Sequence, residues 1–293
     1  MLVLGTAFIS GFSIFINKFG VSAINSNIFT FLKNSVVAIF LTALIFVLKD
    51  FKLLRGLTKK NWGLLLLIGL VGGSIPFLLF FKGLSLTNPA GASFIQKTMF
   101  LWILVLAGIF LKEKISKNYL IAGCLLVAGN LLLLKLSAIE FGQGSLLVLI
   151  ATLFWAVENV ISKYAIKELP PRIVMWGRMF FGSLFILIFL AFSGQAILLT
   201  KLNLHQIGWS VFTGVLLIGY VMTWYTGLKY IKVSEAAIIL MLGSPITTFF
   251  TAIFYQTIGA KEFIAALLII AGVVFAIGVK RISQEICQIY ART

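Results

Sequence analysis

Hydrophobic stretches of about 20 residues follow one another along this chain, separated only by short polar segments. Of the 293 residues, 61% are apolar and 11% are charged. About 20 apolar residues cross a bilayer as an α-helix, and backbone groups in lipid must form their hydrogen bonds within the segment. The sequence therefore predicts an all-α polytopic membrane protein.

Ten such stretches predict ten transmembrane helices. Turn-forming residues separate them, for example Thr87-Asn88-Pro89 and Pro170-Pro171. The predicted spans are 2–17, 28–48, 62–81, 90–111, 119–134, 145–165, 173–192, 207–228, 235–255 and 262–279.

The net charge of +16 is distributed unevenly between the predicted loops. Residues 193–206 contain Lys201 as their only Lys or Arg. Residues 49–61, by contrast, contain Lys49, Lys52, Arg55, Lys59 and Lys60. Because basic residues concentrate on the cytoplasmic side of a membrane protein, this bias predicts a multi-pass protein of the inner (cytoplasmic) membrane with both termini in the cytoplasm. It also explains the positive charge without a nucleic-acid partner.

The chain repeats itself. Gly83-Leu84 aligns with Gly227-Leu228, and Asn17-Lys18-Phe19 aligns with Ser162-Lys163-Tyr164. Aligned residues stay 143 to 145 positions apart. This pattern predicts two repeats of five helices each, at 1–137 and 142–281, followed by a cytoplasmic tail at 282–293.

An odd number of spans per repeat places the second repeat in the membrane upside down relative to the first. Inverted repeats are typical of secondary transporters, in which the two halves open a midplane site to each side in turn. A duplicated bundle that transports nothing is the alternative.

Several motifs resemble those of the EamA-type transporters of the drug/metabolite transporter (DMT) superfamily. They are the two Gly-Leu pairs, the small-residue runs Ala90-Gly91-Ala92-Ser93 and Ser234-Glu235-Ala236-Ala237, Leu111-Lys112-Glu113, Ser244-Pro245, and a basic residue early in the second helix of each repeat, Lys33 and Arg178. The resemblance implies ten helices in a five-plus-five arrangement, transport of small metabolites, amino acids or drugs, and no organic cofactor. Leu101 stands in place of a proline equivalent to Pro245, and Gln256-Thr257 in place of Lys-Glu; these departures count against equal gating roles for the two halves.

Four charged residues fall more than one helical turn inside the predicted spans: Lys33, Lys97, Glu158 and Arg178. A charge at the bilayer centre costs roughly 2.5–3.5 kcal/mol on insertion scales, so such residues usually serve a function. Lys97 is predicted to anchor a carboxylate, phosphate or sulfate of the substrate; alternatively it reaches the interface along its own stem.

Glu158 has three possible roles: it carries a coupling proton, pairs with a basic residue as a counter-ion, or contacts the substrate. Lys33 and Arg178 act either as electrostatic gates or as interfacial anchors. Three positive charges against one negative charge favour an anionic or zwitterionic substrate, most simply an amino acid.

Three aromatic residues, Trp155, Tyr220 and Trp224, are predicted to line the cavity, although plain packing also explains them. Gly69 and Gly73 form a G-x-x-x-G pattern, which favours close helix packing within one chain over dimerisation.

The predicted function is secondary active transport of a small-molecule metabolite across the lipid bilayer. Protons are a candidate coupling ion. The predicted oligomeric state is a monomer or a homodimer. A drug or lipid-linked substrate exporter and a non-transporting receptor or scaffold are the alternatives. The sequence contains no P-loop motif, no H-E-x-x-H and no metal-ligand spacing, so neither an enzyme nor a metal site is predicted.

Overall fold

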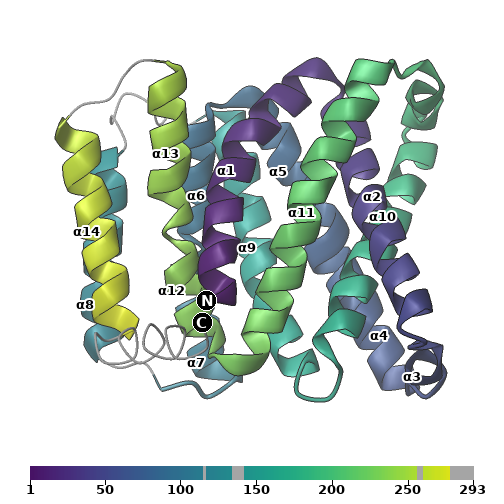
Figure 1. The fold of residues 1–293 in the computed structure, drawn as a ribbon, viewed down its shortest axis with the longest axis horizontal. Coiled ribbons are helices and arrows are strands. Elements are labelled where there is room, and N and C mark those ends of the chain that lie inside the picture. The colour runs from purple at the N-terminus through teal and green to yellow at the C-terminus, as the bar shows by residue number, and fades with distance from the viewer. Residues whose placement is uncertain (115–116, 134–141, 256–259, 278–293) are drawn as a thin grey trace, which may run out of the picture.

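A computed structural model describes residues 1–114, 117–133, 142–255 and 260–277, and within these ranges all regular elements are helical (Figure 1). The predicted tail at 282–293, together with the ends of both predicted repeats, lies outside the described residues. The elements are α1 (Leu2–Ala23), α2 (Ser26–Val47), α3 (Phe51–Arg55), α4 (Lys59–Ile68), the π-helical turn η1 (Gly69–Ser74), α5 (Ile75–Leu86), α6 (Pro89–Lys97), α7 (Met99–Phe110), α8 (Lys117–Leu133), α9 (Gln143–Ala165), α10 (Pro171–Phe192), the 3-10 helix η3 (Gln195–Lys201), α11 (Leu204–Tyr230), α12 (Val233–Leu240), α13 (Gly243–Phe254) and α14 (Ala260–Ile277).

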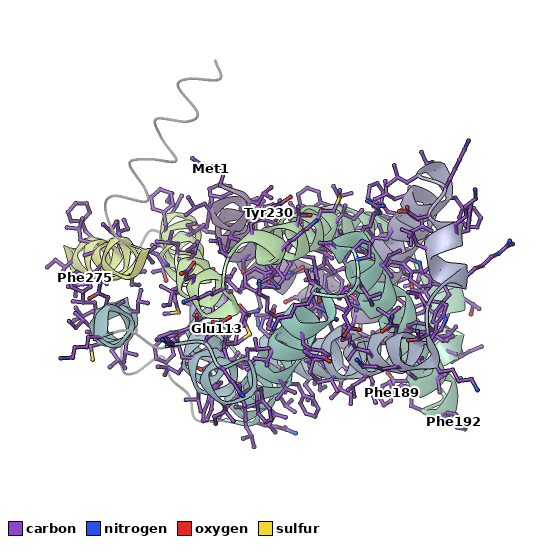
Figure 2. All side chains as sticks on the ribbon, turned by 90° about the horizontal axis from the view of Figure 1, so that it is seen from below. Met1, Glu113, Phe189, Phe192, Tyr230 and Phe275 are labelled. Atoms are coloured by element: carbon purple, nitrogen blue, oxygen red, sulfur yellow. The ribbon has the colours of Figure 1, made fainter. Side chains whose placement is uncertain are left out.

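Eight helical segments are long and apolar enough to cross a membrane: α1, α2, α4–α5, α6–α7, α9, α10, α11 and α12–α13. Large apolar side chains such as Phe189, Phe192 and Phe275 point away from the bundle (Figure 2). An all-α polytopic membrane protein is thereby confirmed. The two remaining predicted spans coincide with α8 and α14, of which α14 contains a shorter apolar stretch, 263–275. The count of ten spans is compatible with this arrangement and stays a prediction.

Two predicted spans, 90–111 and 235–255, are each broken into two helices near the middle. The second break, at 241–242, precedes Pro245, which has no N–H for the helical hydrogen bond. The first break occurs at Thr98 although Leu101 replaces the proline. Thr98 Oγ1 donates to the Ile95 carbonyl at 2.7 Å, and such a bond competes with the backbone ladder. Different residues thus produce a break at corresponding positions.

The span predicted at 62–81 contains the π-helical turn η1, which frees backbone carbonyls from the regular ladder. The Gly72 carbonyl accepts from Trp155 Nε1 at 3.1 Å and from Arg178 Nε at 3.3 Å. The Gly73 carbonyl accepts from Asn34 Nδ2 at 3.0 Å. Side chains of neighbouring helices therefore satisfy the groups that the turn exposes, as a membrane interior requires.

The first helix of each predicted half packs mainly against helices of the other half. α1 lies against α11 and α13, while α9, its counterpart in the predicted second repeat, lies against α5, α6 and α7. α8 and α14 pair with each other at one end of the bundle (Figure 1). This exchange is compatible with the predicted inverted repeat, because each half then completes the other.

Two lysines at aligned positions close the ends of two helices. Lys18 Nζ donates to the carbonyls of Leu84 at 2.9 Å and of Thr87 at 2.7 Å, at the end of α5. Lys163 Nζ donates to the carbonyls of Leu228 and Ile231, at the end of α11. A cation there satisfies unpaired carbonyls and complements the helix dipole. The first span continues beyond residue 17, where it was predicted to end, since α1 includes Lys18 and extends to Ala23.

Glu113 connects the two predicted halves. It lies at the other end of the helix axes from Lys18. Its carboxylate accepts from the backbone N–H of Val233 at 3.1 Å and from Ser234 Oγ at 2.5 Å, at the start of α12. A carboxylate at a helix N-terminus satisfies free donors and complements the dipole. The aligned Gln256-Thr257 lies outside the described residues.

The contact between η1 and α10 generates a prediction about stability. A side chain at Gly73 would collide with the Arg178 carbonyl oxygen and with Gly182, both of them backbone. We expect Gly73→Ala to lower the free energy of unfolding by about 1–3 kcal/mol, the usual cost of overpacking. Thermal unfolding of the detergent-purified protein measures this change.

The matched control is Gly63→Ala on α4, where an added methyl group meets nothing within 4 Å. It should leave stability unchanged or raise it slightly, because alanine favours a helix over glycine. Equal unfolding temperatures for the two variants would contradict the close packing of η1 on α10.

Candidate functional site

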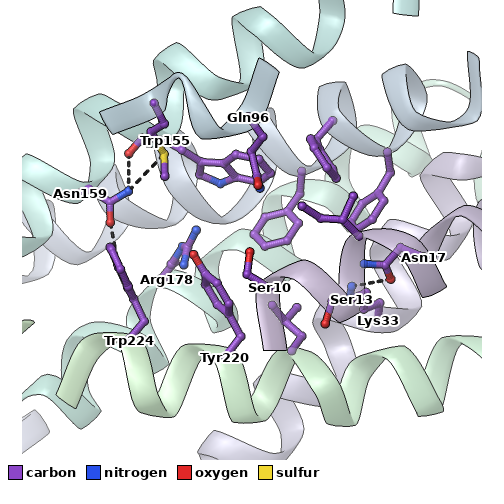
Figure 3. Close-up of a pocket in the computed structure, with 16 residues that line it drawn as sticks. Ser10, Ser13, Asn17, Lys33, Gln96, Trp155, Asn159, Arg178, Tyr220 and Trp224 are labelled. Carbon is purple, nitrogen blue, oxygen red and sulfur yellow. Dashed lines mark hydrogen bonds between the residues drawn. The ribbon is translucent and has the colours of Figure 1, made fainter. Parts of the chain in front are cut away.

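A central cavity lies between the helices of the two predicted halves (Figure 3), and the empty space within it and at its opening amounts to ≈ 610 Å³. Its wall is a mixture of aromatic rings and polar side chains. The lining residues are Ser10, Ser13, Ile14 and Asn17 of α1, Lys33 of α2, Phe77, Phe80 and Phe81 of α5, Gln96 of α6, Met99 of α7, Trp155 and Asn159 of α9, Arg178 of α10, and Leu217, Tyr220 and Trp224 of α11. Aromatic rings combined with a few polar side chains are a lining typical of small-molecule sites.

Lys33 enters the cavity wall from α2 with 2% of its surface exposed. Its Nζ donates to Asn17 Oδ1 at 2.8 Å and lies 4.8 Å from the centroid of the Phe81 ring. Within the described part of the chain no carboxylate pairs with it. Neutral amide and aromatic groups thus hold this ammonium group.

Lys97 ends α6 immediately before the break at Thr98, and it too is 2% exposed. Its Nζ donates to Ser10 Oγ at 2.7 Å and to Gln96 Oε1 at 3.1 Å. Ser10 and Gln96 line the cavity, so Lys97 lies directly behind the wall rather than in it. Among the residues that the structure describes, no carboxylate neutralises Lys97.

Arg178, unlike the two lysines, faces a carboxylate. Its Nη2 lies 3.7 Å from Glu158 Oε2, and both side chains are buried. Glu158 Oε1 accepts from Ser162 Oγ and from Tyr225 OH, each at 2.5 Å. Glu158 Oε2 makes no hydrogen bond in the part of the chain that the structure describes. The glutamate therefore stands behind Arg178 and does not line the cavity.

Space for Glu158 comes from Gly72, since a side chain there would occupy the position of the Glu158 methylene groups. The Gly72 carbonyl also holds Arg178 and Trp155 toward the cavity. One glycine of the π-helical turn therefore positions three of the predicted site residues.

Lys33 and Arg178, which align in the predicted repeats, have matching surroundings. Lys33 lies over Phe81, and the Arg178 guanidinium carbon lies 5.7 Å from the ring centroid of Tyr225, which aligns with Phe81. Cations over aromatic faces are stabilised by the ring quadrupole. The two positions differ in charge balance, because Glu158 aligns with the neutral Ser13.

The three predicted aromatic residues meet in the cavity wall. Tyr220 and Trp224 stack with ring centroids 6.2 Å apart, and Trp224 Nε1 donates to Asn159 Oδ1 at 2.8 Å. Trp155 packs edge-on to Phe77 at 5.3 Å. Of the seven predicted site residues, Lys33, Trp155, Arg178, Tyr220 and Trp224 line the cavity, whereas Lys97 and Glu158 lie behind it.

Neutral polar residues of the wall were missed by the sequence analysis. Ser10, Ser13 and Asn17 lie three and four positions apart on α1, so they share one helix face. That polar stripe within an apolar span was the available signal. Within the described ranges, no group of three or more His, Cys, Asp or Glu side chains gathers as a metal site would require.

Comparisons with known proteins agree with this architecture. YyaM of Bacillus subtilis (strain 168), an uncharacterized transporter, is 26% identical over 236 residues, covering 77% of this chain and 76% of that protein. YoaV of the same organism, also an uncharacterized transporter, is 25% identical over 198 residues, covering 65% of this chain and 67% of that protein. One crystal structure superimposes with a TM-score of 0.70 at 17% identity, covering 92% of this chain and 97% of that one, which shows a shared fold.

The family assignment rests on the whole length of the chain. The sequence model of the EamA-like transporter family matches residues 1–135 and again residues 142–278. The predicted resemblance is confirmed, whereas the repeat boundaries at 137, 142 and 281 stay predictions. The chain is a membrane transporter that belongs to the EamA-like transporter family of the DMT superfamily.

Proposed function

We propose that this protein is a secondary active transporter that moves a small anionic or zwitterionic metabolite, such as an amino acid, by alternating access around the central cavity. One observation carries the proposal: Lys33 and Lys97 are buried at the cavity, and their hydrogen-bond partners among the described residues, Asn17, Ser10 and Gln96, are all neutral.

Buried charge without an opposite charge is costly, and a bound anion would lower that cost. Arg178 is already balanced by Glu158, so the remaining charge near the cavity is positive. A substrate carboxylate could accept from Lys33, and from Lys97 if the side chains of the wall rearrange. Ser13 Oγ is buried in the wall with no hydrogen-bond partner among the described residues, which leaves it available to a substrate.

Alternating access is supported by the matched surroundings of Lys33 and Arg178. In this proposal each of them closes the cavity toward one side in turn, and the Glu113 contact to α12 closes the end predicted to face the cytoplasm. The transporter would work in the cytoplasmic membrane, with both termini inside, as a monomer or homodimer, without a cofactor and without catalysing a reaction.

Glu158 is the proposed coupling residue. Among the described residues its Oε2 pairs with Arg178, at 3.7 Å, and makes no hydrogen bond, so binding of a proton there would remove the charge that balances the guanidinium. Arg178 would then be free to bind the substrate anion. A fixed counter-ion role for Glu158 is the alternative.

Ligand-dependent stability tests the substrate class. A ligand that binds only the folded state adds about 2.7 kcal/mol at a hundred times its dissociation constant. We expect amino acids or other carboxylates to raise the unfolding temperature of the detergent-purified protein, and organic cations to leave it unchanged. Stabilisation by organic cations alone would refute a positively charged site.

Lys97→Ala should abolish uptake of the stabilising ligand into liposomes. It removes one of the two ammonium groups that have no carboxylate partner among the described residues. The matched control is Lys82→Ala, an exposed lysine on α5 that should transport normally. Size-exclusion chromatography verifies that both variants insert and fold. Normal transport by folded Lys97→Ala would exclude Lys97 as the anchor.

Glu158→Gln should make transport independent of an imposed proton gradient, because an amide keeps the side-chain volume but cannot exchange a proton. Tyr225→Phe is the control: it removes one donor to Glu158 yet keeps the carboxylate, so the gradient response should persist. If Glu158→Gln responds to the gradient as the natural protein does, Glu158 is a structural counter-ion.

A further inference from the structure

A second hollow lies on the outside of the bundle, away from the central cavity. It is a groove between α4, α7 and α9, with ≈ 1030 Å³ of empty volume, here called the lateral groove. All of its lining residues are aliphatic or aromatic, among them Leu64, Leu106, Val157, Val160 and Tyr164. Val157 is 41% exposed, so the groove opens on the surface that faces lipid.

The corresponding seam in the other half is filled. The repeat alignment pairs Val157 with Phe12, Val160 with Phe15 and Leu106 with Phe250. These three phenylalanines pack together between α1 and α13, with the Phe250 centroid 5.0 Å from that of Phe12 and 6.0 Å from that of Phe15. At these three positions aliphatic residues stand where the filled seam has rings, and the missing rings leave space that forms part of the lateral groove.

One end of the lateral groove is basic. Lys60 Nζ lies 3.3 Å from Tyr164 OH and 5.5 Å from the centroid of the Tyr164 ring, and its side chain is 63% exposed. Leu111, which follows α7, lines the groove. The exposed Lys112 and Lys114 come just after it in the chain. Of the acidic side chains nearby, Glu113 binds the start of α12 and Glu168 pairs with Lys60 at 3.3 Å. Positive charge therefore predominates at this end.

We propose that the lateral groove binds one phospholipid with an anionic headgroup. An acyl chain would lie along Leu106, Val157 and Val160, where burial of its methylene groups is favourable. The phosphate would lie near Lys60 at the membrane surface, where basic side chains attract anionic lipids. This site is separate from the substrate cavity and does not depend on the identity of the substrate.

Native mass spectrometry of the purified protein, offered an equal mixture of phosphatidylglycerol and phosphatidylcholine with identical acyl chains, tests the proposal. The natural protein should retain one lipid, predominantly phosphatidylglycerol. Val157→Phe restores the ring found at the aligned Phe12 and should abolish retention. The control Leu146→Phe changes another exposed position on α9, outside the groove, and should retain lipid normally.

The headgroup contact is tested by Lys60→Gln, which leaves the apolar groove intact. Loss of one lysine near an anionic headgroup should reduce the preference for phosphatidylglycerol about fivefold. Lys201→Gln, an exposed lysine of η3 far from the groove in the fold, should leave the preference unchanged.

Three results would overturn the proposal. The first is retention of lipid by Val157→Phe at the level of the natural protein. The second is equal retention of the two lipids by the natural protein, or a preference that Lys60→Gln does not alter. The third is a dimer that Val157→Phe converts to monomers, since a second copy of the chain would then occupy the groove. If Val157→Phe fails to fold, the Lys60→Gln comparison decides alone.

Discussion

Every backbone polar group inside a bilayer needs a partner from the protein, and this requirement organises the structure. At the π-helical turn η1 and at the ends of α5 and α11, side chains from other helices satisfy the exposed groups. Trp155 and Arg178 bind the Gly72 carbonyl of the π-helical turn, and Lys18 closes the end of α5. Because these partners come from different helices, each bond also fixes how two helices sit against each other.

The same requirement separates the buried charges into two kinds. Arg178 has backbone, aromatic and carboxylate partners, so its position is accounted for by the folded protein. Lys33 and Lys97 have neutral partners only among the described residues. In the function proposed above, a transported anion would be the partner that balances these two ammonium groups.

The two predicted repeats share several features but differ in detail. Lys18 and Lys163 perform the same capping role at aligned positions, and helix breaks occur at corresponding places whether or not a proline is present. By contrast, Glu158 aligns with neutral Ser13, and the phenylalanine-filled seam between α1 and α13 aligns with an open groove. Backbone capping by lysine is therefore common to both predicted repeats, whereas the side chains of the proposed substrate and lipid sites differ.

Apolar segment length predicted the all-α membrane fold, in which eight helical segments of the described residues are long and apolar enough to cross a membrane, because this property is local and acts through the membrane solvent. The family resemblance and the candidate residues Lys33 and Arg178 also came from local motifs. Partners could not be predicted in this way. Lys97 meets Ser10 across 87 positions and Glu158 meets Tyr225 across 67, and hydropathy carries no information about which helix faces touch. Whether an intramembrane charge is balanced or open to a ligand depends on those contacts, and hence on how the helices pack.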